Sequence, residues 1–78
     1  MNNMTWQTIL KRQTTQSVID NIGKQRDILK ELDEMVRKFH GEEMINGEEF
    51  EDLAGEYHRL HKTTMDSIKR ILGSLRRA

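Results

Sequence analysis

The sequence predicts an all-α fold: an antiparallel helical hairpin with a short N-terminal amphipathic segment, which dimerises into a four-helix bundle. Three observations predict it. The 78-residue chain has no proline, its aliphatic residues recur three and four positions apart, and about six residues separate two long periodic segments. A linker this short favours antiparallel neighbours. We therefore expect residues 1–78 to form a single helical domain.

The first expected element is a short amphipathic helix over residues 5–13, in the stretch "TWQTILKR". Thr5 is suited to cap its start, and Trp6, Ile9 and Leu10 share one side of it. The following "QTTQ" interrupts the apolar pattern. This segment therefore either continues into the next helix or folds back as a third, short helix.

The second expected element is a long helix over residues 17–40, with Ser17 as a candidate N-cap and Gly41 as its stop. Its predicted contact seam alternates steps of four and three residues: Val18, Ile22, Gln25, Leu29, Leu32, Val36 and Phe39, flanked by Ile28 and Met35. Gly23 is a possible break. Because the seam continues past Gly23, we expect an uninterrupted helix there.

An acidic turn over residues 41–46 leads into a third expected element, a helix over residues 47–75. Asn46 is a good N-cap, and carboxylates fill the first turns, where they favour the positive end of a helix. The apolar stripe runs through Phe50, Leu53, Tyr57, Leu60, Thr64, Ile68, Ile71 and Leu75, with Met65 and Leu72 beside it.

The charges are segregated along a chain whose formal net charge is zero. Residues 41–57 contain seven acidic and no basic residues, whereas residues 58–78 contain six basic residues and one acidic residue. The apolar surface is also broader than one neighbouring helix can cover. We therefore expect self-association into an antiparallel dimer, in which each acidic tip lies beside the other copy's basic end.

The sequence offers little support for catalysis, and we expect no enzyme activity, cofactor or small-molecule substrate. The stretch "MINGEEFEDL" resembles the end of an EF-hand loop, but Lys38 and His40 would then occupy ligand positions, and Glu43 would replace the required glycine. His58 and His61 share a helix face and are the candidate metal ligands. A site needs a third or fourth ligand, which a second copy could supply across a dimer. No nucleophile–base motif is present.

Two candidate binding surfaces remain. The residues expected to contact another protein are Trp6, Ile9, Leu10, Ile28 and Met35. In that surface Trp6 is either a lid on the bundle core or an exposed anchor. The residues expected to contact nucleic acid, as the alternative, are Lys11, Arg12, Lys69, Arg70, Arg76 and Arg77. No apolar run is long enough to cross a bilayer, and the absence of cysteine favours a cytoplasmic location.

The opening residues Thr5, Trp6, Ile9, Leu10 and Lys11 resemble the Thr/Ser-Trp-x-x-Ile-Leu-Lys start of small uncharacterised proteins from tailed phages and environmental microbes. This resemblance implies a phage or accessory-gene origin and carries no known chemistry. The sequence therefore predicts a non-enzymatic, self-associating interaction or regulatory protein that binds a host or viral protein. The alternative is a dimeric nucleic-acid-binding bundle.

Overall fold

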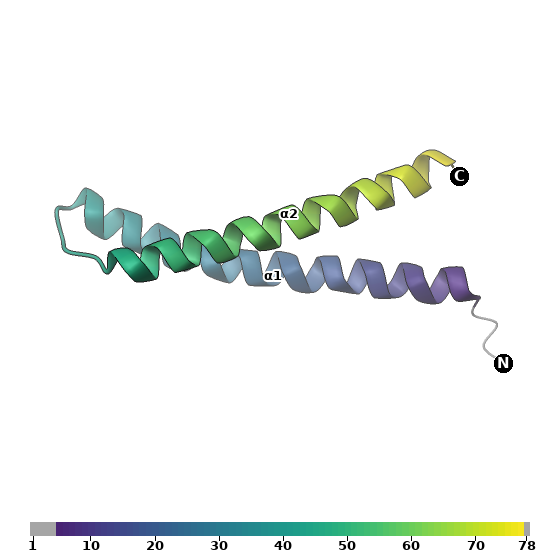
Figure 1. The fold of residues 1–78 in the computed structure, drawn as a ribbon, viewed down its shortest axis with the longest axis horizontal. Coiled ribbons are helices and arrows are strands. Elements are labelled where there is room, and N and C mark those ends of the chain that lie inside the picture. The colour runs from purple at the N-terminus through teal and green to yellow at the C-terminus, as the bar shows by residue number, and fades with distance from the viewer. Residues whose placement is uncertain (1–4, 78) are drawn as a thin grey trace.

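The computed structural model describes residues 5–77, apart from the side chain of Gln7. Residues 1–4 and 78 of the expected domain, including the methionine before the matched opening motif, lie outside this range. Two helices, α1 (Trp6–His40) and α2 (Gly47–Arg77), run antiparallel and pack against each other (Figure 1). The structure confirms the predicted all-α helical hairpin.

Helix α1 is continuous from Trp6 to His40, so the separation into helices over residues 5–13 and 17–40 is wrong. Residues 14–16 lack apolar periodicity, but nothing in them breaks a helix. Thr15 keeps its hydroxyl within the helix by donating to the carbonyl oxygens of Lys11 at 2.9 Å and Arg12 at 3.1 Å. Ser17 consequently lies inside the helix and caps nothing, whereas the expected continuity through Gly23 is confirmed.

The helix ends follow the predicted capping pattern. The Thr5 hydroxyl accepts the backbone N–H of Thr8 at 3.2 Å, and the Asn46 side-chain oxygen accepts that of Glu49 at 3.1 Å. Gly41 ends α1, and its N–H bonds to the carbonyl of Arg37 at 3.0 Å. The left-handed residue of the turn is Glu42, with φ 62. Helix α2 ends at Arg77, two residues beyond the predicted end.

The contact between the helices differs in register from the predicted seam. The buried side chains are Val18, Gln25 and Ile28 of α1 and Thr64 of α2. Ile28 is only 7% exposed, so the expectation that it lies on an outer flank is wrong. The inward-facing residues of α1 keep Val18, Gln25 and Leu32 from the predicted seam, but Asn21, Ile28 and Met35 replace Ile22, Leu29 and Val36. The predicted members Ile22, Leu29, Val36 and Phe39 are exposed.

The hairpin is elongated, and its exposed surface is large for its mass. Its extents are 59 × 27 × 17 Å, and its radius of gyration is 17.7 Å, against about 11.5 Å for a compact domain of this length. Its accessible surface is 6942 Å². A compact 9.2 kDa monomer exposes about 4,900 Å². The excess of about 2,000 Å² is surface that a globular chain of this size would bury.

Candidate interaction surface

Large apolar side chains dominate the exposed part of the hairpin. Eleven of them are exposed, while only two apolar residues in the described range count as buried: Val18 at 9% and Ile28 at 7%. The exposed ones are Trp6, Leu10, Ile19, Ile22, Leu29, Val36, Phe39, Met44, Met65, Leu72 and Leu75. Single exposed apolar residues are ordinary in proteins, but a contiguous set marks a contact surface.

Three of these side chains form a stripe along one face of α1, which we call the α1 stripe: Ile22, Leu29 and Val36. Ile19 and Phe39 are also exposed, about 80° around the helix from Leu29 to either side of the stripe. Ile22, Leu29 and Val36 are spaced seven residues apart. Seven residues complete two helical turns to within about 20°, so these three side chains share one face. They are 40%, 47% and 51% exposed, because α2 covers only one side of each.

A second exposed group lies at the end of the hairpin that holds the start of α1 and the end of α2, and we call this the open end. The two helices separate toward it (Figure 1). Its most exposed apolar residues are Trp6 at 77% and Leu75 at 65%. Six exposed cations lie in the same end portions of the two helices: Lys11, Arg12, Lys69, Arg70, Arg76 and Arg77. Between residues 5 and 77, none of these six forms an ion pair.

The centre of the hairpin contains a buried polar pair that joins the two helices. The side-chain amide of Gln25 donates to the Thr64 hydroxyl at 2.7 Å and to the Asn21 carbonyl at 3.2 Å. The Thr64 hydroxyl in turn donates to the Leu60 carbonyl at 2.7 Å. Gln25 is 8% and Thr64 4% exposed. Every donor of this pair is satisfied, so the two helices are aligned at one point by hydrogen bonds.

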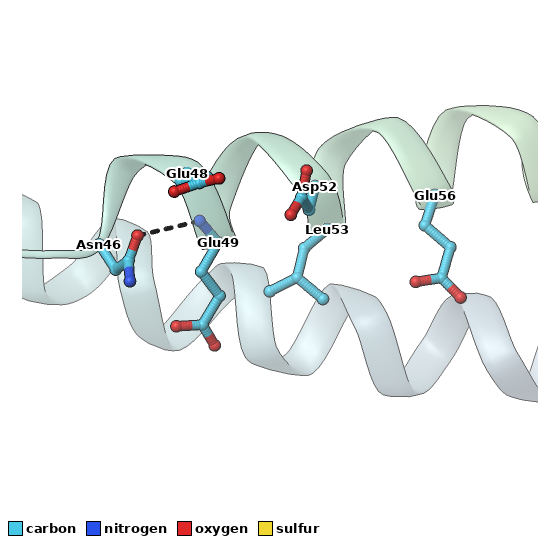
Figure 2. Close-up of a pocket in the computed structure, with 6 residues that line it drawn as sticks. All are labelled: Asn46, Glu48, Glu49, Asp52, Leu53 and Glu56. Atoms are coloured by element: carbon cyan, nitrogen blue, oxygen red, sulfur yellow. Dashed lines mark hydrogen bonds between the residues drawn. The ribbon is translucent and has the colours of Figure 1, made fainter.

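The acidic start of α2 forms a shallow hollow of about 300 Å³, lined by Asn46, Glu48, Glu49, Asp52, Leu53 and Glu56. Figure 2 shows Glu49, Leu53 and Glu56 directed toward α1, while Glu48 and Asp52 point away from it. The carboxylates therefore diverge and do not converge on a single point. The side-chain oxygen of Asn46 already accepts the hydrogen bond from the Glu49 N–H that caps α2. The EF-hand-like stretch thus forms a capped helix start.

The candidate metal ligands His58 and His61 are both exposed on α2. His61 stacks on the ring of Tyr57, with ring centres 5.7 Å apart and an interplanar angle of 20°. Among residues 5–77, no three His, Cys, Asp or Glu side chains gather closely enough to hold a metal ion. The geometry assigns His61 to packing on an aromatic neighbour.

One intrahelical ion pair lies beside the α1 stripe. Arg37 donates to the Asp33 carboxylate at 2.9 Å, four residues earlier. The hydrogen bond and the charge of Asp33 raise the pKa of the Arg37 guanidinium above its ordinary value. Both side chains are largely exposed, so the pair contributes little to stability.

The predicted protein-binding residues separate into two groups. Trp6 and Leu10 are exposed and Ile9 is half-buried, all at the start of α1. Ile28 is buried and Met35 is half-buried against α2, so the structure does not bring these two together with Trp6. Ile19 was absent from the predicted surface, although it is 62% exposed. Its spacing of three residues from Ile22, which makes the two side chains neighbours on a helix, was the available signal.

No helix within residues 5–77 combines the length and the apolar character that crossing a bilayer requires. Comparison with protein families, with curated proteins and with solved structures gives no match to this chain.

Proposed function

We propose that this chain is a non-enzymatic helical protein that dimerises and acts by binding another protein. The observation that carries the proposal is the set of eleven exposed large apolar side chains on a hairpin with almost no buried core. Each one that becomes buried stabilises an assembly by up to about 1.5–3 kcal/mol. The isolated hairpin leaves this stabilisation unused.

Charge supports an antiparallel arrangement of the two copies. The acidic residues 42–56 lie at the closed tip, and the six cations lie at the open end. An antiparallel dimer places each tip beside an open end of opposite charge, whereas a parallel dimer places seven carboxylates against seven.

The start of α1 supplies the surface proposed for the second protein. Trp6, Ile9 and Leu10 lie within five residues of each other, and Trp6 is 77% exposed. Tryptophan is one of the residues enriched among those that contribute most to binding energy in protein interfaces. The resemblance of this segment to phage proteins supports a host or viral protein as the partner and the cytoplasm as the setting.

Two measurements test this proposal. Sedimentation equilibrium should give the mass of a dimer for the intact chain. Affinity capture from the native cell should then recover a partner that Trp6→Ala and Leu10→Ala release, while Thr63→Ala, at an exposed site on the other helix, retains it. A chain that stays monomeric and captures the same proteins with and without Trp6 contradicts the proposal.

A nucleic-acid-binding dimer is the second candidate, and the six unpaired cations at the open end favour it. If these cations contact phosphates, the affinity for labelled RNA or DNA must fall steeply as salt rises, because each contact releases counterions. Replacing Arg76 and Arg77 by glutamine should flatten that dependence. Binding that is weak and insensitive to salt excludes this candidate.

A further inference from the structure

The α1 stripe has a symmetry that identifies what covers it. Ile22 and Val36 each lie seven residues from Leu29 on the same face. The flanking Ile19 and Phe39 each lie ten residues from Leu29, about 80° around the helix to opposite sides. The exposed apolar residues between positions 19 and 39 are therefore distributed equally on both sides of Leu29. When the apolar residues have the same spacing in both directions from a central residue, each one lies level with an apolar residue of an antiparallel copy of the helix.

We propose that a second copy of this chain packs its α1 antiparallel against the α1 stripe, with the two-fold axis passing beside Leu29. This inference rests on the proposed antiparallel self-association and adds its face and its register. Leu29 then contacts Leu29 of the second copy, and Ile22 lies level with its Val36. Ile19 of one copy and Phe39 of the other lie at the same height but on opposite sides of the contact, so they border it. A two-fold interface requires such reciprocal pairing.

The charged residues beside the stripe agree with this register. Arg26 lies three residues before Leu29, and Asp33 lies four residues after it. Both project to the same side of the stripe at 100° per residue. In the antiparallel pair, Arg26 of one copy is therefore nearly level with Asp33 of the other, and symmetry produces this opposite-charge pairing twice.

The charges of α2 also agree with this antiparallel register. The hydrogen bond between Gln25 and Thr64 fixes which part of α2 lies level with which part of α1. Through that alignment, the acidic first half of α2 lies level with the second half of the other copy's α2. That second half carries Lys69, Arg70, Arg76 and Arg77.

The exposed area is also sufficient. A stable protein interface takes about 800 Å² from each partner, and permanent homodimers take more. The hairpin exposes 6942 Å², about 2,000 Å² above the value for a compact chain of its mass. The area that a standard interface takes from one partner is less than half of this excess.

The register leaves the start of α1 outside the contact. Helix α1 ends at His40, eleven residues after Leu29, so the α1 of the second copy extends only to the level of Val18. Trp6, Ile9 and Leu10 lie beyond that point on each copy. The dimer therefore presents two identical binding segments at opposite ends, separated by about 70 Å at 1.5 Å per residue. It is a bivalent binder.

Cysteine cross-linking tests this arrangement, because the chain contains no cysteine of its own. Leu29→Cys should cross-link with itself several-fold more than Asp27→Cys, which lies about 160° around the helix from Leu29. Ile22→Cys and Val36→Cys should each cross-link poorly alone and efficiently when mixed. Leu29 and Asp27 are both exposed, and circular dichroism verifies that each variant remains helical.

The outcomes separate this inference from the proposed function. A dimer in which Asp27→Cys cross-links as well as Leu29→Cys overturns the proposed face and leaves self-association intact. Efficient cross-linking of Ile22→Cys with itself indicates a parallel pair and overturns the orientation. A chain that sediments as a monomer overturns both proposals together.

Discussion

At the residue scale, the most informative feature is the polar pair Gln25–Thr64 at the centre of the contact. Both side chains are at least 92% buried, and each donor has an acceptor. A satisfied polar pair contributes little net stability, but leaving one member alone is costly. Its effect is on alignment, since any sliding of α2 along α1 separates the two side chains.

Replacing Thr64 with valine should therefore destabilise the chain. The variant keeps the shape of the side chain but removes the acceptor of the Gln25 amide, which costs about 1–3 kcal/mol of unfolding free energy. Urea unfolding at one fixed protein concentration measures the loss. Combining Thr64→Val with Gln25→Leu removes both polar groups and should recover most of the lost unfolding free energy.

The neighbouring Thr63 provides the matched control. Its hydroxyl donates to the Arg59 carbonyl at 3.1 Å within α2, and the residue is exposed. Thr63→Val should change the unfolding free energy by no more than about 0.5 kcal/mol. If Thr63→Val and Thr64→Val lower the unfolding free energy equally, the interhelical hydrogen bond does not contribute to stability.

At the scale of the elements, the sequence predicts the hairpin and its caps but not which face of α1 meets α2. Both Ile28 and Leu29 are apolar, and Val18, Gln25 and Leu32 belong to either seam. Hydrophobicity favours Ile22 over Asn21, whereas the structure turns Asn21 inward and leaves Ile22 exposed. One partner helix covers one seam, so periodicity alone cannot distinguish a contact within the chain from a contact between copies.

The predicted break before Ser17 failed for a different physical reason. A stretch without apolar periodicity removes the packing signal for a helix, yet glutamine and threonine do not prevent helix formation. The exposure of Trp6 and Leu10 does not depend on that break, because a short amphipathic segment has the same face whether its helix stops or continues.

The continuity of α1 through Gly23 provides a prediction for the helix itself. A Cβ at this position meets no other atom within 4 Å, and no positive φ is present there. Gly23→Ala should therefore raise the unfolding free energy by about 0.5–1 kcal/mol, because glycine loses more backbone entropy in a helix. Urea unfolding and helical content by circular dichroism measure the gain, and a loss of stability contradicts the continuous helix.

At the scale of the whole molecule, stability should depend on association. If two copies cover each other's α1 stripe, the unfolding midpoint must rise with protein concentration, because dissociation accompanies unfolding. Leu29→Gln should weaken the dimer about ten- to hundredfold, since two half-exposed leucines leave the contact at about 1 kcal/mol or more each. Thermal melts over two decades of concentration and sedimentation equilibrium measure both effects.

Asp27→Gln is the control for that experiment, because Asp27 lies on the far side of α1 at nearly the same height. It should leave both the dimer mass and the concentration dependence unchanged. If Leu29→Gln behaves like Asp27→Gln, the α1 stripe is not the surface that holds the copies together.

The overall arrangement of the dimer predicts a distance rule. In an antiparallel pair centred on Leu29, each residue farther from Leu29 moves the two equivalent positions about 3 Å farther apart, because each helix rises 1.5 Å per residue. Spin labels on Lys11→Cys should therefore be about 54 Å apart, whereas labels on Asp33→Cys should be within about 20 Å. Both positions are exposed and accept a label. Pulsed electron paramagnetic resonance measures these distances, and a parallel dimer gives nearly equal short distances at both positions. A linear increase with distance from Leu29 fixes the centre of the contact, because the line extrapolates to its minimum at the residue beside the two-fold axis.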